Sequence, residues 1–160
     1  MAFLTEKKIS VVVPCYNEET NMLELYARLS KVFQIITPQC EFIFVDNNSR
    51  DNTRDVLRDM ARADARVKII LFSRNFGHGQ YGYSAGAEHA SGDAVICMEA
   101  DLQDPPEVIV DFVKKWQEGF DVVYGVRPRA VGTRTVRFFR KLFYRLFSKL
   151  SYLDIPNDAG

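Results

Sequence analysis

The sequence has few cysteines and no excess of charge of either sign. Its three cysteines, Cys15, Cys40 and Cys97, are scattered and lack the short spacings of a metal-binding motif. An odd number of scattered cysteines favours a reduced, cytosolic protein over a disulfide scaffold. There are 21 basic and 21 acidic residues, so the formal net charge is zero. The overall charge therefore indicates no partner, and we expect none among nucleic acids.

Long apolar runs are also absent. No uninterrupted apolar stretch reaches the roughly 20 residues that are needed to cross a bilayer. Residues 1–8 lack the order of charges and apolar core that a signal peptide has. We find no internal repeat and no low-complexity linker. A chain of 160 residues with 47% apolar and 26% charged residues is ordinary for one soluble globular domain.

Short apolar runs alternate with segments that have helical spacing. Five runs predict strands, at residues 9–13, 41–45, 67–72, 94–98 and 121–124. The first helix is expected to open at residues 15–19, and a small-residue helix is expected at residues 83–90. The predicted apolar positions of the other helices are Met22, Leu25, Leu29, Val32, Val56, Leu57, Met60, Val108, Phe112 and Trp116. This alternation predicts an α/β fold, a mostly parallel sheet with helices on both faces.

The predicted strands end in polar or glycine-rich residues. The carboxyl ends of parallel strands meet at one edge of the sheet, and ligands bind there, where the strand order reverses. We therefore expect the functional loops at that edge. A dinucleotide oxidoreductase is disfavoured, because no Gly-x-Gly-x-x-Gly motif follows the first predicted strand.

The loop after the fourth predicted strand is rich in acidic oxygens. The strand runs directly into Glu99, Asp101 and Gln103. Glu99 and Asp101 are two residues apart, so their side chains point the same way if the strand persists. Oxygen ligands are those that Mg²⁺ and Mn²⁺ prefer, and these ions keep waters that a phosphate can replace. A solvated acidic turn fits the pattern equally well at this point.

A helix start follows this acidic loop. Asp104 suits the N-cap, Pro105 suits the first helical position, and Glu107 stands where a capping box places its acid. The sequence thus predicts a helix that begins directly after the candidate metal ligands.

Four of the loops, taken together, resemble those of the family 2 glycosyltransferases. They read VPCYNE at 13–18, VDNNSRDNT at 45–53, RNFG at 74–77 and EADLQDPPE at 99–107. The subgroup that they resemble most is the polyprenyl-phosphate sugar transferases, such as dolichol-phosphate mannose synthase and undecaprenyl-phosphate glucosyltransferases. The resemblance implies a GT-A type nucleotide-binding domain over residues 1–132, with a further region at 133–160.

The resemblance also implies which residues contact the nucleotide. The first loop lies against the base and ribose in that family, although Tyr16 is also explained as a partly buried aromatic. The positions implied to bind nucleotide are Pro14, Tyr16, Glu18, Asp46, Asn47, Ser49, Asn75, Gly77, Glu99 and Ala100.

The second loop departs from the family pattern. It reads Asp46-Asn47-Asn48-Ser49, where the family usually has Asp-Asp-Gly-Ser. An Asn amide can accept from uracil N3–H and donate to a neighbouring carbonyl, whereas the adjacent donors of guanine suit a carboxylate. We therefore expect a UDP-sugar rather than a GDP-sugar. Asn48 is tolerable in place of Gly, because Asn enters left-handed backbone conformations more readily than most residues.

The metal motif departs from the pattern too. The family has Asp-x-Asp, and this chain has Glu99-Ala100-Asp101. The longer glutamate displaces the first carboxylate, so either the metal affinity falls or Glu99 acts through water. The resemblance thus implies Mg²⁺ or Mn²⁺ at Asp101 and Gln103, with Glu99 as a third candidate, and makes Asp101 the foremost catalytic candidate.

Basic residues follow the last predicted strand. Arg127, Arg129 and Arg134 lie in a glycine-containing loop. Family members use arginines here for the pyrophosphate and the acceptor phosphate, consistent with bidentate guanidinium chemistry, which makes Arg127 and Arg134 catalytic candidates. A flexible basic surface loop is the alternative.

Residues 133–150 form a predicted amphipathic helix. No acidic residue occurs between Arg127 and Lys149. One arc of the helix is apolar, with Val136, Phe139, Leu142, Phe143, Leu146, Phe147 and Leu150. The other arc is basic, with Arg134, Arg137, Arg140, Lys141, Arg145 and Lys149. Such a helix either packs on its own domain or lies on an anionic leaflet, and the lack of acids favours the membrane surface.

The resulting hypothesis is an inverting transferase that moves a hexose from a nucleotide-sugar to a polyprenyl phosphate. We expect it at the cytoplasmic side of the cell membrane, with this chain itself soluble. The acceptor phosphate is largely dianionic at neutral pH, so no strong general base is needed.

Two alternatives remain open. A family 2 transferase could use a soluble or polysaccharide acceptor, or the chain could be a degenerate module that binds nucleotide without turnover. A homo-oligomer is also possible. The chain ends inside a predicted loop at 155–160, so we expect a truncated C-terminus.

Overall fold

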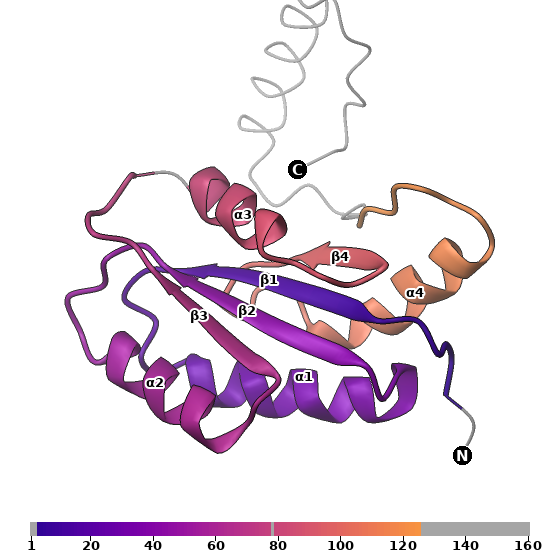
Figure 1. The fold of residues 1–160 in the computed structure, drawn as a ribbon, viewed down its shortest axis with the longest axis horizontal. Helices are drawn as coiled ribbons and strands as arrows, with labels where there is room; N and C mark the ends of the chain where they lie inside the picture. Colours follow the sequence, from indigo (N-terminus) through magenta and orange to yellow (C-terminus); the bar gives the residue numbers. More distant parts are fainter. Residues whose placement is uncertain (1–2, 78, 126–160) are drawn as a thin grey trace, which may run out of the picture. The chain divides into compact units, whose positions relative to one another are not determined.

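The computed structural model describes residues 3–77 and 79–125. Its centre is a parallel four-stranded sheet in the order β3-β2-β1-β4 (Figure 1). The strands are β1 (Ile9–Cys15), β2 (Cys40–Asp46), β3 (Val67–Leu71) and β4 (Ala94–Cys97). The predicted parallel sheet is therefore confirmed, and the bounds of its four strands lie close to the predicted ones.

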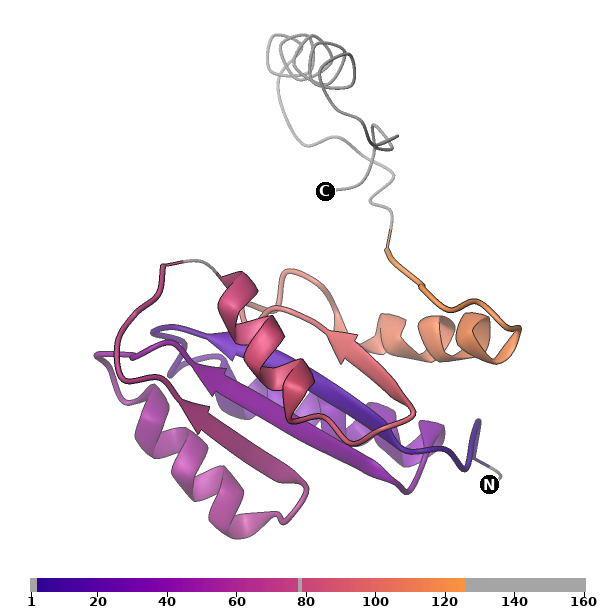
Figure 2. The same cartoon turned by 45° about the horizontal axis from the view of Figure 1, so that its top comes forward.

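Helices cover both faces of this sheet. They are α1 (Met22–Ile36), α2 (Thr53–Ala63), α3 (Gly79–Glu88), the 3₁₀ helix η1 (Pro106–Val108) and α4 (Ile109–Gln117). Figures 1 and 2 show α1 and α2 on one face of the sheet and α3 on the other. The predicted α/β architecture is confirmed. None of the described helices is long and apolar enough to cross a bilayer.

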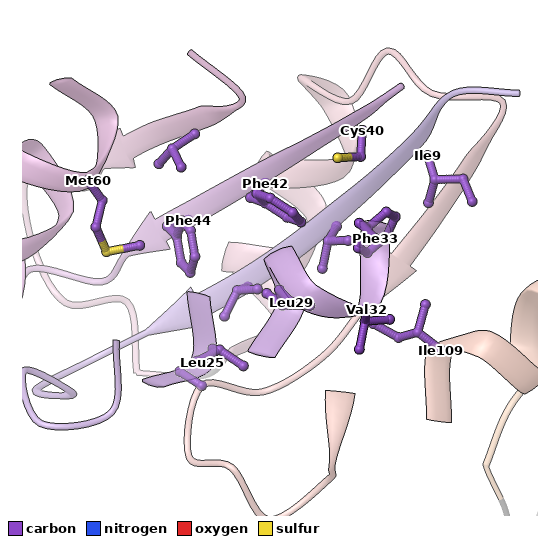
Figure 3. Close-up of a cluster of buried hydrophobic side chains, with 14 of the residues drawn as sticks. Ile9, Leu25, Leu29, Val32, Phe33, Cys40, Phe42, Phe44, Met60 and Ile109 are labelled. Atoms are coloured by element: carbon purple, nitrogen blue, oxygen red, sulfur yellow. The ribbon is translucent and has the colours of Figure 1, made fainter. Parts of the chain in front are cut away.

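The larger core lies between the sheet and α1 (Figure 3). Its aromatic centre is Phe42 of β2, whose ring meets Phe33 of α1 edge-on at a centroid distance of 5.4 Å. All the predicted apolar positions of α1 are buried, because their spacing places them on one helix face. Each such side chain contributes about 1.5–3 kcal/mol when it leaves water. This core fixes the sheet on which the loops are mounted.

A smaller core lies under α3 on the opposite face. It contains Val12, Ile43 and Val45, with Tyr83 packed against them. The helix comes so close to β1 that a Cβ atom on Gly86 would lie 2.2 Å from Val12 Cγ1. Only glycine permits this approach, since real Cβ atoms essentially never come so near another heavy atom.

The connection through α3 creates the point where the strand order reverses. The chain passes from β1 to β2 to β3 in one direction and then crosses over through α3 to place β4 on the other side of β1. The loops after β1 and β4 therefore follow adjacent strands at the carboxyl edge of the sheet. Open α/β sheets bind ligands in the crevice that such a reversal leaves.

Two predictions about the helix bounds are wrong. The first helix begins at Met22 and not within residues 15–19, because Asn17 has a left-handed backbone with φ of 57°. In α4 the buried positions are Ile109 and Val113, whereas the predicted Val108 is 37% exposed. The buried positions thus lie one residue beyond the predicted Val108 and Phe112, whereas the predicted Trp116 does pack against the core.

The fifth predicted strand is also wrong. Residues 121–124 are irregular, and the side chain of Val122 is 78% exposed. A strand needs a hydrogen-bonded neighbour, and the structure gives this segment none among the described residues. Met1–Gly119 form one compact unit, and the chain from Phe120 onward belongs to a second. The predicted boundary at residue 132 lies outside the described residues.

Candidate functional site

Strained backbone gathers in the loops at the carboxyl edge of the sheet. Among the described residues, Asn17, Asn48 and Leu102 are the non-glycine positions with left-handed backbone, at φ values of 57°, 63° and 60°. They belong to the loops after β1, β2 and β4 respectively. The left-handed backbone of Asn48 agrees with the expectation that Asn is tolerable there in place of Gly. Such strain is retained where surrounding contacts enforce it, most often at functional sites.

The loops after β1 and β2 are joined by hydrogen bonds. Asn17 N–H donates to Ser49 Oγ at 2.9 Å, and Asn17 Oδ1 accepts from Arg50 N–H at 2.8 Å. Glu18 N–H donates to Thr53 Oγ1 at 2.8 Å. Tyr16 is 38% exposed beside this rigid pair of loops, so its ring is available to a bound group.

Asp46, at the end of β2, is fully buried. Its carboxylate accepts from Ser49 N–H at 3.1 and 3.2 Å and from Arg54 Nε at 2.6 Å. Arg54 in turn donates from Nη2 to Phe72 O at 2.7 Å. Asp46 thus holds the second loop and links it to the end of β3. Its predicted contact with a nucleotide stays a prediction.

Asn47 brings the third loop to the second. Its Nδ2 donates to Asn75 Oδ1 at 3.1 Å, and its Oδ1 accepts from Phe76 N–H at 2.9 Å. Asn75 Oδ1 also accepts from Gly77 N–H at 2.6 Å. The structure therefore places three of the predicted nucleotide-binding residues, Asn47, Asn75 and Gly77, in one hydrogen-bonded group.

The thiol at the end of β1 is inert. Cys15 is buried, and its Sγ–H lies 3.6 Å from Val45 O. Burial raises the pKa of this thiol well above its usual range, and the charges of Asp46 and Glu18 raise it further. Cys15 therefore offers no thiolate nucleophile to the site.

The strand before the acidic loop is shorter than predicted. β4 ends at Cys97, although Met98 N–H still donates to Val12 O at 3.1 Å. The next bond of this parallel ladder would need an N–H from Pro14, and proline has none. Glu99 and Asp101 therefore lie in a loop, and the expectation that they share one face of a continuing strand is wrong.

The acidic loop presents its carboxylates around a buried residue. Ala100 is 3% exposed, while Glu99 is exposed and Asp101 is half-buried. Gln103 N–H donates to Asp101 Oδ1 at 3.0 Å, and the left-handed Leu102 lies between them. This turn fixes the Asp101 carboxylate and leaves the Gln103 side chain exposed.

Tyr83 of α3 belongs to the same electrostatic environment. Burial, together with the smaller effect of the negative charges of Glu99, Asp101 and Asp104, raises the pKa of Tyr83 to about 12. The sequence motifs did not identify this residue as part of the site. The available signal was one of two tyrosines in a helix rich in small residues, which is explained equally well by core packing.

The predicted capping box is wrong. The turn begins at Pro106, and Pro105 is its N-cap residue. Glu107 instead accepts from Arg28 of α1, at 3.0 Å from Nε and 2.6 Å from Nη2. This hydrogen bond lowers the pKa of Glu107. The far end of the acidic loop is therefore anchored to α1 by a bidentate ion pair.

The expected metal ligands have the right donor atoms. Asp101 and Glu99 supply carboxylate oxygens and Gln103 supplies an amide oxygen, which suits Mg²⁺ or Mn²⁺. Within residues 3–77 and 79–125, no three His, Cys, Asp or Glu side chains are grouped closely enough to hold an ion by themselves. An ion here would need further oxygens from water or phosphate. Arg127, Arg129, Arg134 and the basic helix at 133–150 lie outside the described residues.

Several of the solved structures that resemble this chain contain a bound nucleotide or nucleotide-sugar. TarS 1-349 of S. aureus in complex with UDP shares 25% identity, with a TM-score of 0.59 over 79% of this chain and 38% of that one. The mannosyltransferase PcManGT from Pyrobaculum calidifontis, in complex with GDP-Man and Mn²⁺, shares 22% identity, with a TM-score of 0.62 over 78% and 37% of the two chains. The fold of the chain is therefore of the GT-A type.

Sequence relatives give the family. The uncharacterized glycosyltransferase YkcC of Bacillus subtilis is 46% identical over 94% of this chain and 47% of its own length. The bactoprenol glucosyl transferase of Shigella phage SfV is 39% identical over 96% and 50%. The chain thus spans about half the length of these relatives. The family model for glycosyl transferase family 2 matches residues 10–158, and the chain belongs to that family.

Proposed function

We propose that this chain forms the nucleotide-sugar-binding part of an inverting hexosyltransferase whose acceptor is a polyprenyl phosphate. The observation that carries the proposal is that the first and fourth loops follow adjacent strands, β1 and β4, where the strand order reverses. The first contributes the exposed Tyr16 ring, and the fourth contributes the Asp101 carboxylate. The name of the phage relative, a bactoprenol glucosyl transferase, supports a lipid phosphate as acceptor.

Different residues would contact different parts of the donor. Tyr16 offers an aromatic face to the base, and the second and third loops hold the neighbouring wall through Asn47. Asp101 and Gln103, with Glu99 directly or through water, would hold Mg²⁺ or Mn²⁺, which neutralises the charge that develops on the leaving diphosphate. Arg127 and Arg134 are proposed to contact the diphosphate and the acceptor phosphate.

The acceptor chemistry explains why no general base is assigned. A phosphate monoester with a second pKa near 6 is mostly dianionic at about pH 7, so its oxygen is already a nucleophile. A hydroxyl acceptor, on a soluble sugar or a polysaccharide, would instead need a carboxylate base. Transfer to a hydroxyl acceptor is the second candidate, and a module that binds nucleotide without turnover is the third.

The donor is proposed to be a UDP-sugar. The amide of Asn47 has its Oδ1 and one of its N–H groups engaged by the third loop, yet each end keeps further hydrogen-bonding capacity. The solved structures similar to this chain include both a UDP and a GDP-Man complex. We assign the proposed preference for uridine over guanosine to the amide of residue 47.

Calorimetry on the intact protein tests the proposed nucleotide preference and the proposed metal ligands. UDP should bind more tightly than GDP, and Mn²⁺ should strengthen UDP binding. Asp101→Asn should remove the part of the affinity that depends on Mn²⁺, at least about tenfold, because a metal-bound carboxylate loses its charge. Glu99→Gln should cost less, and Glu99→Asp should bind Mn²⁺ as well as or better than the natural protein.

Asp111→Asn on α4 is the matched control, since this exposed carboxylate pairs with Lys114 three residues on in the same helix. It should leave UDP binding and its Mn²⁺ dependence unchanged. Equal or tighter binding of GDP would refute the uridine preference. A loss in Glu99→Gln as large as in Asp101→Asn would make Glu99 a direct ligand.

A further inference from the structure

We infer that Asn47 is a positioning residue that locks the third loop, residues 74–77, and that the lock requires an amide rather than the carboxylate usual at this position. The inference rests on the proposed function, because the locked loop is offered as one wall of the nucleotide site. The hydrogen bonds that define the lock are themselves independent of any ligand.

Two backbone N–H groups fix the orientation of both amides. Phe76 N–H donates at 2.9 Å to residue 47, so the atom of Asn47 that it meets must be the oxygen. Gly77 N–H donates at 2.6 Å to residue 75, so Asn75 likewise presents its oxygen there. It follows that the NH₂ group of Asn47 faces the oxygen of Asn75, at 3.1 Å.

The same residue reaches the first loop through its backbone. Asn47 N–H donates to Cys15 O at 2.9 Å, directly before Tyr16. Asn47 is only 8% exposed, so water does not readily replace these bonds. One residue thus connects the loops after β1, β2 and β3.

The lock also sets the position of an aromatic and basic group. The Phe76 ring meets Phe72 edge-on at 5.2 Å, and the Arg74 guanidinium lies over Phe76 at 4.6 Å from its centre. Phe76 N–H is one of the bonds to Asn47. Loss of the bond to Asn47 would therefore remove one of the contacts that position Phe76 and, through it, Arg74.

The two asparagines respond differently to replacement by aspartate. In Asn47→Asp, the ionised carboxylate could still accept from Phe76 N–H, but its second oxygen would face the oxygen of Asn75. Turning the Asn75 amide would only bring its NH₂ group against Gly77 N–H. Asn75, by contrast, uses one oxygen as acceptor for both donors, so Asn75→Asp keeps both bonds.

Protonation of the aspartate in Asn47→Asp gives a further test of whether the lock requires a donor at residue 47. A neutral aspartic acid has one oxygen acceptor and one O–H donor, so in its protonated form the Asn47→Asp variant can reproduce the pattern of Asn47. Burial and the facing oxygen would raise the pKa of the introduced carboxyl group, and the neighbouring Asp46 charge acts in the same sense. The negative charges of Glu18 and Asp51, which lie near Cys15, would also raise this pKa, while the positive charges of Arg54 and Arg74 would lower it.

The test is amide hydrogen exchange of Phe76 and Gly77 in the intact protein, with UDP affinity measured in parallel. Both are measured at about pH 8 and at about pH 5, because a raised pKa makes the introduced carboxyl group more protonated at the lower pH. Relative to the natural protein at the same pH, Asn47→Asp should lose protection of both amides at the higher pH by at least about tenfold, the size of one lost hydrogen bond. Its UDP dissociation constant should rise similarly. Both losses should shrink at the lower pH.

Asn75→Asp should keep the amide protection at both pH values, and Asn47→Ala should lose it equally at both. Three results would overturn the inference. They are unchanged amide protection in Asn47→Asp, a loss of protection in Asn75→Asp as large as in Asn47→Asp, and no recovery of protection in Asn47→Asp at the lower pH. If Asn47→Asp is unfolded at the higher pH, its melting temperature should rise toward that of the natural protein at the lower pH. If the natural protein binds no UDP, the proposed function fails. The amide exchange rates of the variants relative to the natural protein would still test the lock.

Discussion

At the scale of single residues, Glu41 of β2 is a buried carboxylate that several polar groups hold in place. Its side chain is 3% exposed and forms ion pairs with Lys68 at 2.7 Å and Lys8 at 3.1 Å. Ser10 Oγ donates to it at 2.6 Å and Ser91 N–H at 2.7 Å. Burial alone would raise the pKa of Glu41, but the bonds from Lys68, Ser10, Ser91 and Lys8 outweigh it and hold the pKa well below its usual range.

The sign of the pH dependence follows from this lowered pKa. The unfolded chain binds a proton at Glu41 near pH 4.5, whereas the folded protein does so only at much lower pH. The stabilisation is therefore complete above about pH 5.5 and is lost as the pH falls toward the folded pKa. Glu41→Gln should lower the free energy of unfolding at neutral pH by about 2–4 kcal/mol, because it leaves two lysines without their partner.

Urea denaturation at about pH 7, 5 and 3 measures this effect. The difference between Glu41→Gln and the natural protein should be large at neutral pH and smaller at the lowest pH. Asp59→Asn is the control, because its pair with Arg62 is exposed on both sides and should contribute little. A constant difference across the pH series would contradict the role given to the Glu41 charge.

At the scale of elements, the contact between α3 and β1 is very close. A Cβ on Gly86 would lie 2.2 Å from Val12 Cγ1, and one on Gly82 would lie 2.7 Å from Pro14 Cβ. Val12 is fully buried and cannot move aside. α3 also carries Tyr83, which lies near the acidic loop. The distance between this helix and the sheet therefore helps to position Tyr83 at the candidate site.

Gly86→Ala should therefore destabilise the protein by about 1–3 kcal/mol, because overpacking exceeds the gain of about 1 kcal/mol that alanine brings to a helix. Gly79→Ala in the same helix is the matched control. Its Cβ would come no nearer than 4.0 Å to Tyr83, so stability should be unchanged or slightly increased. Urea denaturation of both variants measures the change in the free energy of unfolding. Equal stability of Gly86→Ala and Gly79→Ala would contradict the close contact between α3 and β1.

At the scale of the whole molecule, the prediction concerns the membrane. If the helix at 133–150 is interfacial, the intact protein should bind vesicles that contain anionic lipid. Each basic side chain near the surface adds about 1 kcal/mol at low salt. Four changes to Gln should then weaken partitioning by about a thousandfold if they add. The changes are Arg137→Gln, Arg140→Gln, Lys141→Gln and Arg145→Gln.

Added salt should mimic these changes, since the Debye length falls from about 10 Å at 0.1 M to about 3 Å at 1 M. Arg58→Gln with Arg62→Gln on the exposed face of α2 is the control and should have little effect. Phe139→Ser with Phe143→Ser tests the apolar arc. Weaker vesicle binding at unchanged melting temperature means that the arc meets lipid. Lower stability with unchanged binding means that it packs on protein.

The sequence determined the alternation of strands and helices, because periodicity and turn residues are local signals. It also determined which loops lie at one edge of a parallel sheet, and that Asn48 is tolerable in place of Gly. These follow from chain order and from the chemistry of single residues. Family membership followed from the motifs in those loops, and the family match agrees with it.

The tertiary structure alone decided where elements end and what the polar side chains hold. β4 stops at Cys97 because Pro14, on a neighbouring strand, cannot donate the next bond. Glu107 turns from a predicted cap to a partner of Arg28, and Asn47 binds Asn75, which lies 28 positions further along the chain. Each outcome depends on a residue far away in the sequence, and a local pattern carries no information about which distant donor or acceptor will lie within about 3 Å of it.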